Sequence, residues 1–353
     1  MRPTRRHLLT ASLGLAASAA GADRARPARG AESSLTFAGF AGLFQDLYDS
    51  AVLTPFQDAH PEAGIFYYGL PSSVQVLATL RRQKQQPAVD VALLDLPSAR
   101  AATEENLVEP LPPALLRDLA PTALFPGIAG PALFSEPLVL LYDPAVMPPP
   151  RSWLGLWNSP DRKTIAVAAP PNPAGLAFTL TAARLFGNGN DRRAVEGGMT
   201  AIAELSRRVV TWDPRPDIDH LIADGGARLG AGWNMPAQVM IDRRPGRLGV
   251  VFPDEGTISR VVTVNLVKGS RRPDAARLLI AHMLSEAAQK AMVATMYLGP
   301  VNAKARYSGA ALTRTANTRE RAARAMPVDW IAAEAMRPFI LDRWRESVPG
   351  AAL

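Results

Sequence analysis

The residue types that most often carry catalysis or hold metals are sparse in this sequence. It contains four histidines, His7, His60, His220 and His282, and no cysteine. The absence of cysteine excludes disulfides, thiolate nucleophiles and cysteine metal sites. The histidines show no metal-ligand spacing among themselves, and the zinc-protease, serine-hydrolase and phosphate-binding loop motifs are missing. We therefore expect no catalytic residues, no metal site and no cofactor.

One group of acids is close enough together in the sequence to be considered as a calcium-binding loop. Asp213, Asp217 and Asp219 lie close together in the sequence. The glycine and the distal glutamate of a calcium-binding loop are missing, so we interpret these acids as helix caps and surface acids.

The remaining chemistry that polar side chains could perform here is reversible binding of a small molecule. Open α/β sheets bind ligands beyond the carboxyl ends of their strands, where loops and helix starts gather. The candidate residues at such ends are Phe40, Gly42, Ser72, Ser73, Asp95, Asn172, Trp233 and Asn234. Phe40 could equally be a core residue, and Asp95 could only cap a helix. Trp233 offers an indole that could stack on a ligand.

The elements that must position these residues alternate between strands and helices. The first part of the chain predicts strands at 35–40, 65–68 and 89–94. Apolar residues between 44 and 52 recur at helical spacing, and Ser72 with Gln75 forms a capping box that opens a helix running to Gln86. This β-α-β-α-β order indicates an α/β lobe.

The middle of the chain predicts a second α/β lobe. Its expected strands are 164–169, 208–212, 228–233 and 248–252, and its expected helices are 175–186, 194–207 and 217–223. A long strand at 258–267 would return to the first lobe, and Pro273 opens a helix after it.

The first thirty residues are typical of an export signal. Arg5 and Arg6 precede a short apolar run from Leu8 to Ala20, and Ala20-Gly21-Ala22 provides a cleavage site. We expect residues 1–22 to be removed, by the twin-arginine route or by ordinary secretion. The removal takes away three arginines and no acid, which lowers the formal charge from +7 to +4. The remaining basic residues are scattered, so we expect no nucleic-acid partner.

Several segments resemble the extracellular solute-binding proteins of ABC importers, in the branch related to spermidine/putrescine-binding proteins. They are TPFQDAHPEAG (54–64), PAVDVALLD (87–95), ENLVEPL (105–111), PPPRSWLGLWNS (148–159), the stretch 251–292, and YLGPVNAKA (297–305). The resemblance implies a type II periplasmic binding protein-like fold, with two α/β lobes and a ligand cleft between them. It implies a periplasmic protein whose partners are a small-molecule ligand and an ABC permease and ATPase complex at the inner membrane.

The resemblance also suggests how the chain divides. Residues 23–34 would form a flexible start, residues 35–135 plus 258–300 lobe 1, residues 140–255 lobe 2, and residues 301–353 C-terminal helices packing on the lobes. Two other functions stay open. An exported periplasmic enzyme would need a catalytic set that we do not find, and a ligand-sensing partner of a membrane receptor would share the fold.

The sequence departs from the polyamine branch at the place where that branch holds its cation. After an EG turn, the branch carries an aromatic residue and then, two positions on, a carboxylate. Aligned from Glu255-Gly256, these positions hold Arg260 and Val262. An arginine pairs with carboxylates or phosphonates, so we expect an anionic or zwitterionic ligand that meets Arg260. Arg260 could instead point outward or pair with Glu255 or Asp254, and Glu255 could be a turn residue or a cleft carboxylate.

Overall fold

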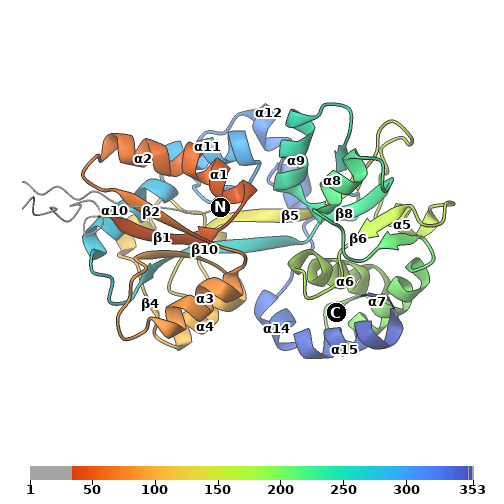
Figure 1. Ribbon diagram of the computed structural model, residues 1–353, viewed down its shortest axis with the longest axis horizontal. Coiled ribbons are helices and arrows are strands. Elements are labelled where there is room, and N and C mark those ends of the chain that lie inside the picture. The colour runs from red at the N-terminus through yellow and green to blue at the C-terminus, as the bar shows by residue number, and fades with distance from the viewer. Residues whose placement is uncertain (1–33, 349, 352–353) are drawn as a thin grey trace, which may run out of the picture.

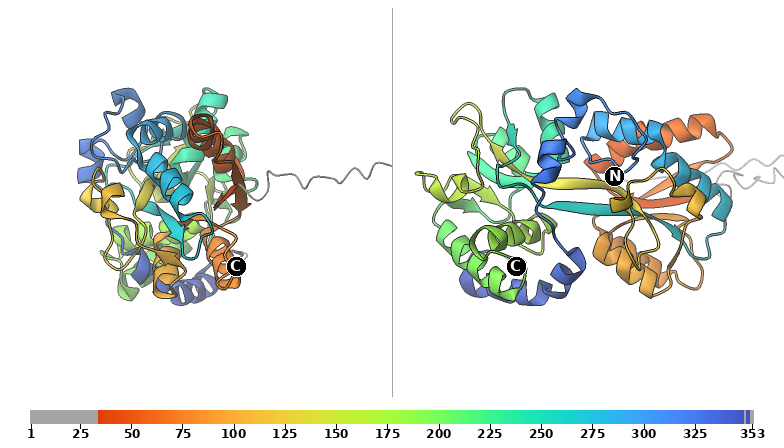
Figure 2. Two further views of the ribbon diagram at one scale, coloured as in Figure 1. Left: turned by 90° about the vertical axis from the view of Figure 1, so that its left-hand side faces the viewer. Right: turned by 180° about the vertical axis from the view of Figure 1, so that it is seen from behind.

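Two lobes lie side by side in the computed structural model, which describes residues 34–348, 350 and 351 (Figure 1). The predicted export signal at residues 1–22 lies outside the described residues. Strands β5 (Ala132–Tyr142) and β10 (Ser259–Val267) run from one lobe into the other, and the view from behind shows the same two connections (Figure 2). The predicted α/β fold with two lobes is confirmed.

The strands form one continuous sheet in the order β2-β1-β3-β10-β5-β8-β6-β7. Parallel pairing joins β2, β1 and β3 at one end and β8, β6 and β7 at the other. The two crossing strands pair antiparallel with each other and with their outer neighbours. Each lobe therefore has its own parallel strands, whose carboxyl ends face the other lobe across β5 and β10.

The first lobe contains the N-terminal elements and the helix pair after β10. Its strands are β1 (Leu35–Phe40), β2 (Ile65–Leu70), β3 (Val91–Asp95) and the short β4 (Val108–Glu109). Its helices are α1 (Leu43–Tyr48), η1 (Asp49–Leu53), α2 (Thr54–Ala59), α3 (Ser73–Arg82), α4 (Leu96–Glu104), η2 (Pro113–Leu115), η3 (Pro121–Ala123), α10 (Pro273–Leu284) and α11 (Glu286–Met296). Helices cover both faces of this part of the sheet (Figure 1).

The second lobe contains the middle of the chain. Its strands are β6 (Ile165–Val167), β7 (Val209–Thr211), β8 (Leu229–Trp233) and β9 (Gly249–Val251). Its helices are α5 (Gly155–Asn158), α6 (Pro173–Phe186), α7 (Arg192–Leu205), α8 (Ile218–Ala223) and α9 (Asn234–Arg243). In the described part of the chain, no helix is long and apolar enough to cross a bilayer.

The C-terminal helices run along both lobes. They are α12 (Gly309–Leu312), α13 (Arg319–Ala323), α14 (Trp330–Ala335) and α15 (Arg337–Ser347). Helix α14 packs against α4 of the first lobe, and α15 packs against α7 of the second. The indole N–H of Trp344, which is fully buried, donates to Thr179 Oγ1 at 2.9 Å and so fastens α15 to α6.

Some predicted elements differ from the observed ones. The predicted helix at 44–52 is part of a longer run in which α1, the π-helical turn η1 and α2 follow one another without a break. Ser72 caps α3 as predicted, because its Oγ accepts the N–H of Gln75 at 3.4 Å, and α3 ends at Arg82 rather than Gln86. Strand β5 was not predicted, although it joins the lobes.

Candidate ligand-binding site

The strand ends of the first lobe bring several predicted residues to one edge of the sheet. Phe40 ends β1, and its ring packs edge-on against Phe44 with 5.5 Å between centroids. Gly42 starts α1 with a φ of 77°, a left-handed conformation that glycine adopts without strain. Asp95 ends β3, and its side chain caps α4 by accepting the N–H of Ser98 at 3.0 Å.

Ser72 and Ser73 lie at the start of α3 on the same edge. Ser73 is buried, and its Oγ accepts the N–H of Asp95 at 2.8 Å. This bond ties the start of α3 to the end of β3. The two serines and Asp95 therefore form one corner of the first lobe, in which the Ser73 hydroxyl already makes a hydrogen bond within the protein.

Arg260 lies next to these strand ends, on the side of the second lobe. On β10, Val262 lies opposite Asp95, so Arg260 lies two residues beyond the end of β3. On the neighbouring strand β5, the residue opposite Arg260 is Glu136. Arg260 donates from Nε to Glu136 Oε2 at 2.9 Å and from Nη2 to the same oxygen. It pairs with neither of the two acids that the sequence suggested, Asp254 and Glu255.

Glu136 connects the arginine to a helix start. Its side chain has no exposed surface, and its other oxygen, Oε1, accepts the N–H of Met235 in the first turn of α9 at 3.0 Å. A carboxylate at a helix N-terminus is stabilised by the unpaired N–H groups and by the helix dipole. The buried charge is thereby compensated from two sides, by Arg260 and by α9.

Trp233 is the second residue that contacts the Arg260 side chain. The guanidinium carbon of Arg260 lies 4.5 Å from the centroid of a Trp233 ring, within the range of a cation–π contact. The Arg260 side chain is 27% exposed, and its Nη1 has no hydrogen-bond partner among the described residues. The arginine is thus held by Glu136 and Trp233, and both N–H groups of Nη1 are left to donate.

Three residues of the second lobe lie at or after the carboxyl ends of the neighbouring strands β8, β6 and β7. Trp233 ends β8, Asn172 follows β6, and Trp212 follows β7. Asn172 caps α6, since its Oδ1 accepts the N–H of Ala174 at 2.9 Å. Trp212 packs edge-on against Trp344, with ring centroids 5.1 Å apart.

The two tryptophans of this edge differ from the other four in one respect. The indole N–H groups of Trp153, Trp157, Trp330 and Trp344 all donate to protein oxygens. Within the described residues, the indole N–H groups of Trp212 and Trp233 have no acceptor, although both side chains are partly buried. Neither nitrogen is among the buried unpartnered side-chain atoms of the described residues, so both N–H groups reach the solvent and are available to a ligand.

Two predicted residues, Asn234 and Glu255, lie apart from these strand-end residues. The Asn234 side chain is fully buried, and its Nδ2 donates to the carbonyls of Tyr297 and Arg314 at 3.1 and 2.9 Å. Its amide joins α9 to the C-terminal segment. Glu255 accepts hydrogen bonds from Ser152 Oγ and from the N–H of Trp153, and it lines a hollow of about 390 Å³ together with residues 323–326.

Sequence reasoning missed Glu136 and Trp212. Glu136 is the single acid of the apolar run ALFSEPLVLLY over 132–142, and an isolated charge in a buried strand needs a partner. That signal was available in the sequence. Trp212 also ends a predicted strand, at 208–212. The rule that selected Trp233 therefore applies to it as well, but no role was predicted for it.

Comparison with known proteins agrees with this architecture. The family model for bacterial extracellular solute-binding proteins matches residues 51–317. Among curated proteins no sequence matches the chain significantly. A putative extracellular solute-binding protein from Bordetella parapertussis is 17% identical with a TM-score of 0.73, covering 90% of this chain and 99% of that one.

Two similar solved structures contain bound solutes. The binding protein MotA from A. tumefaciens B6, in complex with glucopine, is 17% identical with a TM-score of 0.72, covering 89% of this chain and 99% of that one. The periplasmic binding protein AfuA from Actinobacillus pleuropneumoniae, with fructose-6-phosphate bound, is 17% identical with a TM-score of 0.70, covering 89% and 98%. At these identities the likeness is one of fold.

Proposed function

The chain belongs to the bacterial extracellular solute-binding protein family, and on that premise we propose that it captures a small polar solute between its lobes. It would deliver this solute to the ABC permease and ATPase complex at the inner membrane. The observation that carries the proposal is the pair of tryptophans, Trp212 and Trp233, whose indole N–H groups have no acceptor among the described residues. In this proposal the solute also accepts from Arg260 Nη1, which belongs to the side chain that packs on Trp233.

The proposed ligand is anionic or zwitterionic. All of these free groups are donors, which suits a solute that carries carboxylate, phosphonate or hydroxyl oxygens. Val262, aligned with the carboxylate of the polyamine-binding branch, is a buried aliphatic residue and cannot pair with an ammonium. The MotA structure holds glucopine and the AfuA structure holds fructose-6-phosphate, which supports a small polar solute by analogy of fold.

We further propose that the lobes close on the solute by a hinge motion in β5 and β10, with residues 35–135 plus 258–300 as one body and 140–255 as the other. The antiparallel pairing of β5 with β10 across the junction supports this division. Cleavage after residue 22 and a periplasmic location belong to the same proposal. Changing Arg5 and Arg6 to Lys should retain the precursor in the cytoplasm if the twin-arginine route is used.

A thermal-shift screen of the exported protein tests the proposed ligand class. The panel comprises amino acids, organic acids, phosphonates, sugar phosphates and polyamines. A solute present at one hundred times its dissociation constant stabilises the folded protein by about 2.7 kcal/mol. We expect a rise of the unfolding midpoint with an anionic or zwitterionic solute. A rise with spermidine or putrescine alone would contradict the assignment.

A further inference from the structure

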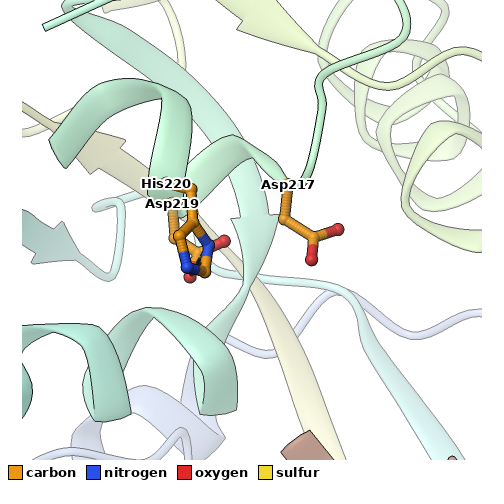
Figure 3. A group of neighbouring side chains, drawn as sticks. All are labelled: Asp217, Asp219 and His220. Carbon is orange, nitrogen blue, oxygen red and sulfur yellow. Dashed lines mark ion pairs between the residues drawn. The ribbon is translucent and has the colours of Figure 1, made fainter. Parts of the chain in front are cut away.

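Three potential metal ligands gather at the start of α8, apart from the residues that form the proposed solute site. Asp217, Asp219 and His220 each offer one ligand atom, and these atoms lie within 4.8 Å of one another. In Figure 3 the side chains of Asp219 and His220 overlap below the start of the helix, and Asp217 lies beside them on the segment that enters the helix. The sequence interpretation assigned Asp217 and Asp219 to helix capping and to the protein surface.

The structure supports that interpretation only for the exposure of Asp217, which lies on the surface. Asp217 occupies the N-cap position of α8, yet its side chain makes no cap hydrogen bond. Asp219 is not a surface acid, because its side chain is only 5% exposed. Among the described residues, no Lys or Arg lies within 4.0 Å of either carboxylate.

The histidine provides a second, independent sign of a missing partner. His220 Nδ1 is buried and has no hydrogen-bond partner among the described residues. It lies 3.5 Å from Asp219 Oδ2, which is too long for a good hydrogen bond. Burial raises the pKa of Asp219, and His220 and the backbone N–H groups of the first turn only partly oppose this effect. Partial desolvation also raises the pKa of Asp217; the charge of Asp219 adds to this shift and that of His220 opposes it.

Local folding explains why the three groups lie close together. Ile218 packs over Gly230 and Gly232 of β8, where a Cβ on Gly230 would come within 2.9 Å of the Ile218 side chain. This contact fixes the apolar side of α8 on the sheet. Asp217 at the N-cap and His220 three residues later are then neighbours, as the two side chains of a capping box are. Asp219 extends between the helix and the protein interior.

We propose that Asp217, Asp219 and His220 form a binding site for a divalent transition-metal ion, with Zn²⁺ as the representative ion. Two carboxylate oxygens and an imidazole nitrogen suit such an ion, whereas Ca²⁺ and Mg²⁺ prefer oxygen ligands alone. The ion would bridge the poorly bonded His220 and Asp219 and neutralise both carboxylates. Three protein ligands leave a fourth position for water or another small ligand. This inference depends on local geometry and is independent of the proposed solute.

Calorimetric titration of the metal-free, tag-free exported protein with Zn²⁺, combined with elemental analysis after dialysis, tests the site. We expect one ion per chain in the wild type, and binding at least tenfold weaker in Asp217→Asn and in His220→Gln. These two positions are less buried than Asp219, and the thermal midpoint of each metal-free variant confirms that it is folded. Rescue by His220→Cys, whose thiolate also binds Zn²⁺, would support direct coordination.

The matched control is His60→Gln. His60 Nδ1 also lies 3.5 Å from a carboxylate, that of Glu62, but no third ligand from the described part of the chain completes a group there. The control should bind Zn²⁺ as the wild type does. Absence of Zn²⁺ binding by the wild type, or equal affinity in the wild type and His220→Gln, would overturn the proposal.

Discussion

Arg260 and Glu136 form an ion pair across the two strands that connect the lobes. Nε and Nη2 of Arg260 both donate to Oε2 of Glu136, while Oε1 of Glu136 caps α9. The glutamate is fully buried and the arginine is 27% exposed. This arrangement neutralises the arginine without enclosing it, so that the guanidinium keeps one face toward Trp233 and, within the described residues, both N–H groups of Nη1 without a partner.

The first prediction concerns this pair and separates folding from binding. Arg260→Ala leaves the Glu136 carboxylate buried with only the N–H of Met235, and should lower the free energy of unfolding by about 3 kcal/mol. This is the lower end of the range for a broken buried pair, because Arg260 is partly exposed. The double variant Arg260→Met with Glu136→Gln leaves no buried charge and should regain most of the lost stability. Urea unfolding of the three proteins measures both effects.

The same double variant tests the contribution of Arg260 to ligand binding. It lacks the N–H donors of the arginine, and its affinity for the solute found in the screen should fall by roughly 1.5–3 kcal/mol. Arg260→Lys keeps the charge but loses the planar fork, and should bind with intermediate affinity. Wild-type affinity in the double variant would remove Arg260 from the ligand site.

The second prediction concerns the turn before β10, on which the C-terminal segment packs. Gly256 has a φ of 95°, and a Cβ there would lie only 1.7 Å from the carbonyl oxygen of Arg324. Gly225 has a φ of 80°, but a Cβ there would meet nothing within 4 Å. Gly225→Ala should therefore cost about 1–2 kcal/mol for the left-handed backbone alone, and Gly256→Ala clearly more. Equal unfolding midpoints for the two variants would show that the contact with Arg324 is not maintained in solution.

The third prediction is a pH dependence that originates at His282. Burial lowers its pKa below the ordinary value of 6.5; the hydrogen bond to the carbonyl of Val52 opposes this shift and the charge of His60 adds to it. Below about pH 6.5 the unfolded chain takes up a proton that the folded protein does not. Stability should therefore be fully present above pH 6.5 and decline as the pH falls toward the folded pKa.

Thermal midpoints at pH 7.5 and pH 5.5 measure this effect. His282→Gln can still donate to Val52 but does not titrate, so its midpoint should fall less between the two pH values than that of the wild type. His60→Gln leaves His282 buried and should retain most of the decline. An equal decline in His282→Gln and in the wild type would place the pH dependence elsewhere.

The sequence was sufficient to predict the elements that depend on local signals. Strand β1 has the predicted bounds, and the capping residues Ser72 and Asp95 act on the helices that follow them. These features depend on residues within a few positions of one another. Strand β5 was missed because Pro137 interrupts an apolar run, and proline seldom occurs inside a central strand. Here Pro137 lies opposite Ser259 at the junction of the lobes.

The site was less predictable, since its contacts join distant segments. The rule that ligands meet strand ends selected Trp233 and Asn172, but it also selected Asn234, whose amide is occupied by protein carbonyls. The partner of Arg260 lies 124 residues away in the sequence, and only the pairing of β5 with β10 brings Glu136 to it. The two acids that the sequence suggested were the nearest ones along the chain.

The central claim is that a small solute binds at the junction of the lobes and meets the free donors of Trp212 and Trp233. Nuclear magnetic resonance of protein labelled with ¹⁵N at tryptophan tests it directly, because the six indole N–H groups give separate signals that single Trp→Phe variants assign. Titration with the solute from the screen should shift the signals of Trp212 and Trp233 and leave those of Trp153 and Trp157, which already donate to protein carbonyls, nearly unchanged. Saturable binding that leaves the Trp212 and Trp233 signals in place would contradict the account.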